Sequence, residues 1–174
     1  MNKTLKWILI VLLILVMAFI FIMSAQNAIK STDESREVGR MIGRILHRDF
    51  DEWDPSDQLA YVRKIDGTVR RFGHFTEFTL LGAVLHLVLT VWGVKEKIAL
   101  PVSFGAGVLY SLTDECHQLF VEGRSFELSD ILLDSAGVAI GALVVWIIVT
   151  AVARKREKKA ETASAEGIDK TESI

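Results

Sequence analysis

The sequence LSDILLDSAGVAIGALVVWIIVTAV, residues 128–152, decides the class of fold. Its ionisable residues are Asp130 and Asp134, and both stand near its start. A helix of about 20 mostly apolar residues is long enough to cross the hydrocarbon core of a bilayer. Five lysines and arginines follow between residues 154 and 159, which indicates that this end lies in the cytoplasm. Residues 128–152 are therefore expected to form a membrane-spanning helix.

Three further apolar runs predict spans at about residues 7–23, 72–92 and 98–116. Lys3 and Lys6 precede the first run, which is long for a signal peptide and is not followed by a small-residue cleavage site, so we interpret it as a retained anchor. Four spans place both termini on the same side, and the positive charges indicate the cytoplasm. The expected fold is an all-α membrane protein, a four-transmembrane-helix bundle.

The composition narrows the class of protein further. Just over half of the 174 residues are hydrophobic, the net charge is −2, and Cys116 is the single cysteine. The near-neutral charge gives no reason to expect a nucleic-acid partner. One cysteine excludes an internal disulfide and a C-x-x-C motif. A length of 174 residues suits one domain, with a membrane domain at 1–152 and a disordered cytoplasmic tail at 153–174, rich in Ala, Glu, Lys, Ser and Thr.

The pattern of residues 24–71 predicts an extracytoplasmic loop, between the first two spans, and this loop contains an amphipathic helix. Ser31 and Glu34 have the spacing of a capping box. Apolar residues follow on one helical face, and arginines recur every four residues on another: Val38, Met41, Ile42, Ile45 and Leu46, and Arg36, Arg40, Arg44 and Arg48. Such a helix lies on a membrane surface near anionic head groups, or it packs on the mouth of the bundle with its arginines solvated.

A second helix of this loop is expected to be short. Asp54-Pro55 has the pattern of an N-cap residue followed by proline at the first helical position. The helix would then end near Asp66-Gly67.

Polar residues gather at one end of the predicted bundle. Ser24 and Gln26 end the first span, and ionisable or amide side chains stand at the same end of the others: Arg70, Arg71, His74 and Glu77, then Asp114, Glu115, His117 and Gln118, then Arg124 in a loop, then Asp130 and Asp134. A charge at membrane depth costs about 2.5–3.5 kcal/mol even on the mildest scale. Spacings of three and four residues put the members of each set on one helix face. We therefore expect a shared polar pocket.

Small residues predict where the helices pack closely. Gly137 and Gly141 form a G-x-x-x-G pattern, and Ser103, Gly107 and Ser111 form a ridge on the third span. We expect both to serve packing within the chain. His86 lies deep in the second span and is expected to be buried and hydrogen-bonded.

The roles within the pocket have alternatives. Arg70, Arg71 and Arg124 would hold an anionic group, and Glu115 and His117 would transfer protons if the protein is an enzyme, which the sequence leaves open. The other interpretation is an ion-pair network in which the three arginines only neutralise Glu77, Glu115 and Asp130. The cofactor is unknown, and a divalent metal is not favoured because no tight ligand spacing is present.

At these residues the chain resembles the VanZ-like family of bacterial membrane proteins, over about residues 7–150. Three blocks carry the resemblance: Ser24-Ala25-Gln26, then Arg70 to Phe78, then Asp114-Glu115-Cys116-His117-Gln118 with Gly123-Arg124, Asp130, Asp134, Gly137 and Gly141. Ala25, Arg71 and Phe78 depart from the family pattern. The resemblance implies a four-span protein of the bacterial envelope. The family's founding member is linked to low-level resistance to the glycopeptide teicoplanin.

Together these observations predict a multi-pass protein of the bacterial cell membrane whose outer polar pocket engages a lipid head group, a lipid-linked precursor or a lipoglycopeptide. Membrane lipids are the expected partners, and protein partners are unknown. The alternative is a non-catalytic accessory protein whose polar cluster only stabilises the bundle.

Overall fold

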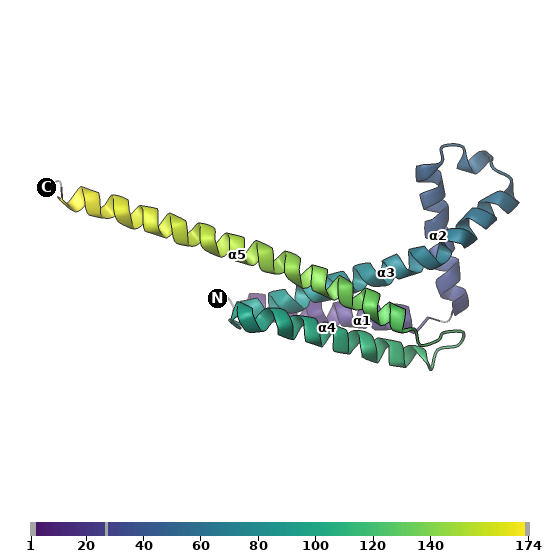
Figure 1. Cartoon of the computed structure of the whole chain (residues 1–174), viewed down its shortest axis with the longest axis horizontal. Helices are drawn as coiled ribbons and strands as arrows, with labels where there is room; N and C mark the ends of the chain where they lie inside the picture. Colours follow the sequence, from purple (N-terminus) through teal and green to yellow (C-terminus); the bar gives the residue numbers. More distant parts are fainter. Residues whose placement is uncertain (1–2, 27, 173–174) are drawn as a thin grey trace.

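The computed structural model describes residues 3–26 and 28–172, and within these ranges it is all-helical (Figure 1). The elements follow in the order α1 (Lys3–Ser24), α2 (Ala28–Leu46), the short 3₁₀ helix η1 (Phe50–Glu52), α3 (Pro55–Val91), α4 (Glu96–Gln118) and α5 (Leu128–Glu172). The helices α1, α4, α5 and the second half of α3 form a bundle. The elements α2, η1 and the first half of α3 form an arm at one end, residues 28–70.

Three of the described helices are long and apolar enough to cross a membrane: Lys3–Ser24, Pro55–Val91 and the Leu128–Ala160 part of α5. The predicted spans at 7–23, 72–92 and 128–152 match these three helices, to within one residue at Trp92. Helix α4 contains the predicted span 98–116 but falls outside this set, since its glycines, serines and acidic end lower its mean hydropathy. The four-span arrangement stays a prediction.

The break expected near Asp66-Gly67 is wrong. Helix α3 runs without interruption from Pro55 to Val91, so the arm and the second span share one helix. A glycine inside a helix costs only about 1 kcal/mol, and no proline follows to stop the helix. The hydroxyl of Ser35 on α2 also donates a hydrogen bond to the carboxylate of Asp66 on α3. The Asp66 side chain therefore has a partner while its backbone stays helical.

The start of α3 confirms the predicted cap. Asp54 is the N-cap, Pro55 occupies the first helical position, and the Asp54 carboxylate accepts a hydrogen bond from the Ser56 amide at 2.9 Å. The hydrogen bonds from the Ser56 hydroxyl and amide lower the pKa of Asp54. The predicted capping box is wrong, because α2 begins at Ala28 and Ser31 lies inside the helix.

Helix α2 packs on α3 through a face that the apolar pattern did not indicate. Ser35, Gly39 and Gly43 are buried, and a Cβ on Gly39 would lie 3.1 Å from Val62. The predicted apolar face stays largely exposed at Val38, Met41, Ile45 and Leu46. Three of its arginines pair with carboxylates: Arg36 with Asp33, Arg40 with Glu37 and Arg44 with Asp51. The helix therefore packs on α3 and keeps an apolar face free.

The core of the bundle lies between α1, α3 and α5. It is built from fully buried side chains such as Ile20, Phe78, Leu81 and Val138. Tyr110 of α4 ties α4 to α1, since its hydroxyl donates to the Met17 carbonyl at 2.6 Å.

Helices α3 and α5 cross at very short range. A Cβ on Gly137 would lie 2.6 Å from the Phe75 carbonyl oxygen, and one on Gly141 would lie 2.8 Å from the Ala83 nitrogen. The expectation that the G-x-x-x-G pattern serves packing within the chain is confirmed. The ridge on α4 is also buried, at Ser103, Gly107 and Ser111.

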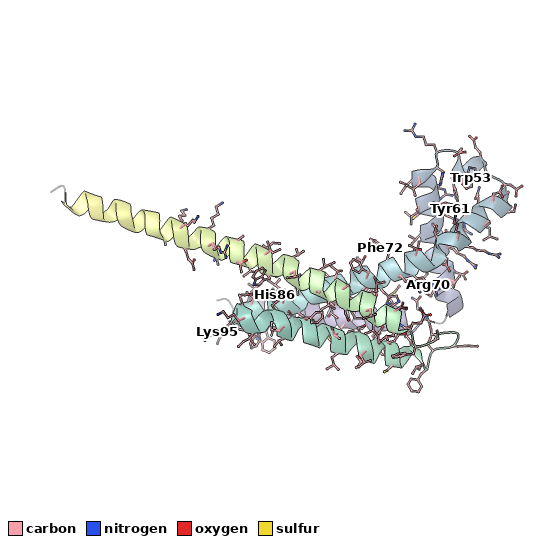
Figure 2. The ribbon with its side chains drawn as sticks, in the orientation of Figure 1. Trp53, Tyr61, Arg70, Phe72, His86 and Lys95 are labelled. Atoms are coloured by element: carbon pink, nitrogen blue, oxygen red, sulfur yellow. The ribbon has the colours of Figure 1, made fainter. Side chains whose placement is uncertain are left out.

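The other end of the bundle holds a separate polar contact. Lys6 of α1 lies over the ring of Trp92 after α3, 5.0 Å from its centroid. His86 is fully buried as expected, and its Nδ1 makes a hydrogen bond of 3.4 Å with the Ser103 hydroxyl. Its Nε2 lies 3.1 Å from a Glu96 oxygen, but neither of these two atoms has a hydrogen-bond partner within the described part of the chain. Figure 2 shows His86 and Lys95 on this side, away from Arg70.

The tail differs from its prediction, because α5 continues as a helix to Glu172 well beyond the span that ends at 152. Alanine, glutamate and lysine have high helix propensities, which favours continuation of an established helix. The start of α1 and the end of α5 lie on the same side of the bundle (Figure 1).

Large apolar side chains cover the outside of the bundle. Trp7, Phe19, Phe104, Leu132 and Ile147 are each more than 40% exposed, and they come from α1, α4 and α5. Soluble monomers rarely expose contiguous apolar surface of this extent. The outer surface therefore suits contact with lipid.

Candidate functional site

The polar residues meet where the arm joins the bundle. The end of α1, the middle of α3, the end of α4 and the start of α5 contribute to this polar end. In Figure 2 the residue labelled Arg70 lies at this junction. The predicted convergence of the four polar sets is therefore present, although the individual side chains divide into two groups.

The first group consists of buried carboxylates that tie the helices together. Asp114 of α4 accepts hydrogen bonds from the Ser24 hydroxyl at 2.7 Å and from the Gln118 amide at 3.3 Å. Asp134 of α5 accepts from the Ser111 hydroxyl of α4 at 2.9 Å. One oxygen of each carboxylate is buried without a hydrogen-bond partner, so these acids are only partly satisfied.

Glu115 fastens the loop between α4 and α5. One of its carboxylate oxygens accepts a hydrogen bond from the Glu127 backbone N–H at 2.6 Å, and the side chain is buried. Glu127 also approaches Arg71, at 3.5 Å, and Arg71 lies 3.7 Å from Asp130. Gly123 turns this loop with a φ of 77°, a conformation that glycine adopts without steric cost, and so directs Arg124 back toward α3.

The second group lines two cavities. The first cavity, about 210 Å³, lies between α2, α3 and the end of α1, and Glu34 and Glu77 contribute to its wall. The second cavity, about 370 Å³, lies between α3, the 119–127 loop and the start of α5. Three cationic or titratable residues line both cavities: Arg70, His74 and Arg124.

Arg70 and Arg124 carry positive charge without a carboxylate partner. Neither makes an ion pair with a side chain in the part of the chain that the structure describes, and the Nε atom of each is buried without a hydrogen-bond partner. Burial, and then the positive charge of Arg70, lower the pKa of Arg124, while the nearby carboxylates of Asp114, Glu115 and Asp130 oppose that shift without forming an ion pair with Arg124 among the described contacts. A desolvated pair of like charges is unfavourable unless an anion satisfies it, so this is the part of the site that lacks a partner.

The two predicted proton-transfer residues do not face each other. Glu115 is directed to the Glu127 amide, and the ring of His117 lies against Phe21 of α1, with centroids 4.4 Å apart. Glu115 and His117 are separated by two positions on α4, and side chains at that spacing point in different directions. Neither residue lines either cavity.

Most of the other predicted residues line the two cavities. Glu77 and His74 face the first, and Arg71, Gln118 and Asp130 face the second. The predicted neutralisation of Arg70, Arg71 and Arg124 occurs at Arg71 alone among the described contacts. No group of three or more His, Cys, Asp and Glu side chains within residues 3–26 and 28–160 is arranged to hold a metal ion.

Sequence reasoning missed two partners. Ser111 was assigned only to the small-residue ridge, yet it binds Asp134, and Glu127 was not considered. Ser111 lies one helical turn before Glu115 on α4, so it belongs to the same end as the acidic set. That spacing is the signal that would have found it.

An all-helical fold, an apolar exterior and a charged end define an integral membrane protein. The chain belongs to the VanZ/LLP1 family, whose model matches residues 9–149. No curated protein and no solved structure matches the chain. The resemblance noted from the sequence blocks is thus confirmed at the level of the family.

Proposed function

We propose that this chain is a bacterial envelope protein whose polar end binds the anionic head group of an amphiphile. Arg70 and Arg124 carry the proposal, because both line the two cavities and neither forms an ion pair with a carboxylate among the described residues. Guanidinium groups bind phosphate and carboxylate oxygens with paired, charge-assisted hydrogen bonds. A head group bearing either anion would satisfy both arginines.

The proposal places this site at the outer membrane face. Four spans, with α4 included, leave both termini in the cytoplasm and the arm outside, as the distribution of lysines and arginines favours. The free apolar face of α2 would then rest in the outer leaflet. Anionic phospholipids, lipid-linked envelope precursors and lipoglycopeptides such as teicoplanin are the amphiphiles with an anionic group that we propose for that face.

Binding measurements test the proposal. Purified protein in neutral detergent is titrated with phosphatidylglycerol and with zwitterionic phosphatidylcholine, and bound lipid is counted by native mass spectrometry. A hydrogen bond to a charged group contributes about 1.5–3 kcal/mol, so Arg70→Gln and Arg124→Gln should each weaken anionic binding at least tenfold. The matched control is Arg63→Gln, which removes an exposed charge of α3 that lines neither cavity. Equal binding of the two lipids, or no effect of either substitution, would contradict the proposal.

The same variants separate the three ligand sources. A lipid-linked precursor and teicoplanin are titrated beside phosphatidylglycerol, and the ligand with the strongest dependence on Arg70 is the preferred one. If teicoplanin or the precursor is that ligand, expression in a susceptible Gram-positive host should lower teicoplanin susceptibility, and Arg70→Gln should restore it. Unchanged susceptibility would remove the resistance role and leave lipid binding.

A structural role is the second candidate, and the hydrogen bonds of Asp114, Glu115 and Asp134 favour it for those acids. Under this reading Glu115→Gln weakens a charge-assisted bond and lowers the melting temperature. Loss of function with unchanged melting would instead favour the proton-transfer role predicted for Glu115 and His117.

A further inference from the structure

The angle between α2 and α3 contains an apolar groove of about 430 Å³. Its walls include Val38 and Ile42 of α2 and Tyr61, Ile65, Val69 and Phe72 of α3. The volume falls within the roughly 300–1,000 Å³ of small-ligand pockets. Phe72 is 67% exposed, so the groove is open on one side.

The groove exists because α2 contacts α3 through small residues. Ser35 and Gly39 bring α2 close to α3, and the Ser35–Asp66 hydrogen bond fixes the contact, while Gly43 packs against the ring of Phe50 in η1. The larger side chains at Val38 and Ile42 are left beside the contact rather than in it. They form a wall that no described segment of the chain covers.

The groove is continuous with the polar cavities. Val38, Val69 and Gly73 line both the groove and the first cavity, and Thr68 lines both the groove and the second cavity. Arg70 lies on α3 between Val69 and Phe72, so the cationic and apolar linings alternate on one helix. Nothing lies within 4 Å of a Cβ built on Gly73, which leaves the junction open.

We propose that the α2–α3 groove holds the hydrocarbon chain of the amphiphile whose anionic head group lies between Arg70 and Arg124. This inference rests on the proposed function and assigns a chain site to it. An apolar lining that shares residues with a cationic cavity matches a ligand with a charged head and an attached chain. Each methylene removed from water strengthens binding about fourfold, so the groove would contribute most of the selectivity for the intact amphiphile.

Photo-crosslinking of the full chain locates the hydrocarbon. Phosphatidylglycerol with a diazirine in one acyl chain is irradiated with the protein in neutral detergent, and the labelled peptides are identified by mass spectrometry. We expect labelling of residues 38–46 and 61–73 at least tenfold above that given by the matching phosphatidylcholine probe. Gly73→Leu, which fills the open junction, should reduce this labelling tenfold.

The control variant is Gly105→Leu, which also enters open space on a helix but lies on α4 away from the groove. It should leave the labelling unchanged. A melting curve of Gly73→Leu that matches wild type confirms that lost labelling reflects the blocked junction, and Gly73→Ala, with a smaller side chain, should retain labelling.

The outcomes separate the two proposals. Labelling outside the groove, together with lipid binding that depends on Arg70, overturns the groove and leaves the head-group site intact. Equal groove labelling by both probes, unaffected by Arg70→Gln, overturns the anionic head group and with it the inference as stated. Unchanged labelling in Gly73→Leu also overturns the groove.

Discussion

Replacing Gly141 by alanine is expected to destabilise the bundle, although the same change usually stabilises a helix. The new Cβ would lie 2.8 Å from the Ala83 nitrogen and closer still to the Thr79 carbonyl oxygen. Both atoms are backbone and cannot rotate away. Helices α3 and α5 would have to separate by more than about 0.6 Å to restore an ordinary 3.4 Å contact.

The magnitude follows from two opposing terms. Overpacking of a close contact costs about 1–3 kcal/mol, and the crossing has equally tight points at Gly82 and Gly137, which would loosen together. Alanine in place of glycine raises the stability of a helix by about 1 kcal/mol. The expected net loss is up to about 2 kcal/mol, or roughly 4–8 °C in melting temperature for a chain of this size.

Thermal unfolding in detergent, followed by circular dichroism, measures the effect. Gly105→Ala is the control, because its Cβ meets nothing within 4 Å and only the gain in helix propensity should remain. The two variants should therefore shift the melting temperature in opposite directions. The reasoning about the α3–α5 crossing is refuted if Gly141→Ala melts as high as Gly105→Ala.

Three other predictions follow from the same structure. Arg124→Gln should leave the melting temperature unchanged or raise it, because it removes a desolvated charge that faces another arginine, and a clear fall would favour a structural arginine. Ser111→Ala should cost about 1–3 kcal/mol by leaving a buried carboxylate of α5 without its donor, and a stability equal to wild type by denaturant unfolding would argue against that bond. In a Cys116→Ser background, an impermeant thiol reagent on whole cells should label a cysteine placed at Asp54 and spare one at Ala160, whereas the reverse pattern would invert the proposed topology.

The helices themselves could be predicted because their signals are local. Apolar runs fixed three of the spans to within a few residues, and Asp54-Pro55 marked the start of α3. The location of the polar end also followed from the sequence, since the sets with carboxylates or histidines, at residues 70–77, 114–118 and 130–134, all stand at the same side of the predicted bundle. The polar blocks also indicated the family, whose model matches residues 9–149.

The partners of individual side chains could not be predicted, because they depend on distances between helices that are remote in the chain. Periodicity placed Glu115 and Asp130 at the same end, but only the packing of α4 against α5 and its loop directed Glu115 to an amide and Asp130 to Arg71. The continuity of α3 past Gly67 could not be predicted either, because a glycine costs a helix only about 1 kcal/mol and the neighbouring contact with Ser35 of α2 is remote in the chain.

The sequence by itself determined a membrane-embedded helical protein with a charged end, since hydrophobicity and helix length are properties of single segments. Tertiary structure decided which charges are neutralised and which are not. Arg70 and Arg124 became the unpaired ones because α3 and the 119–127 loop bring them to the same cavities while the nearby acids bind serines, an amide and Arg71.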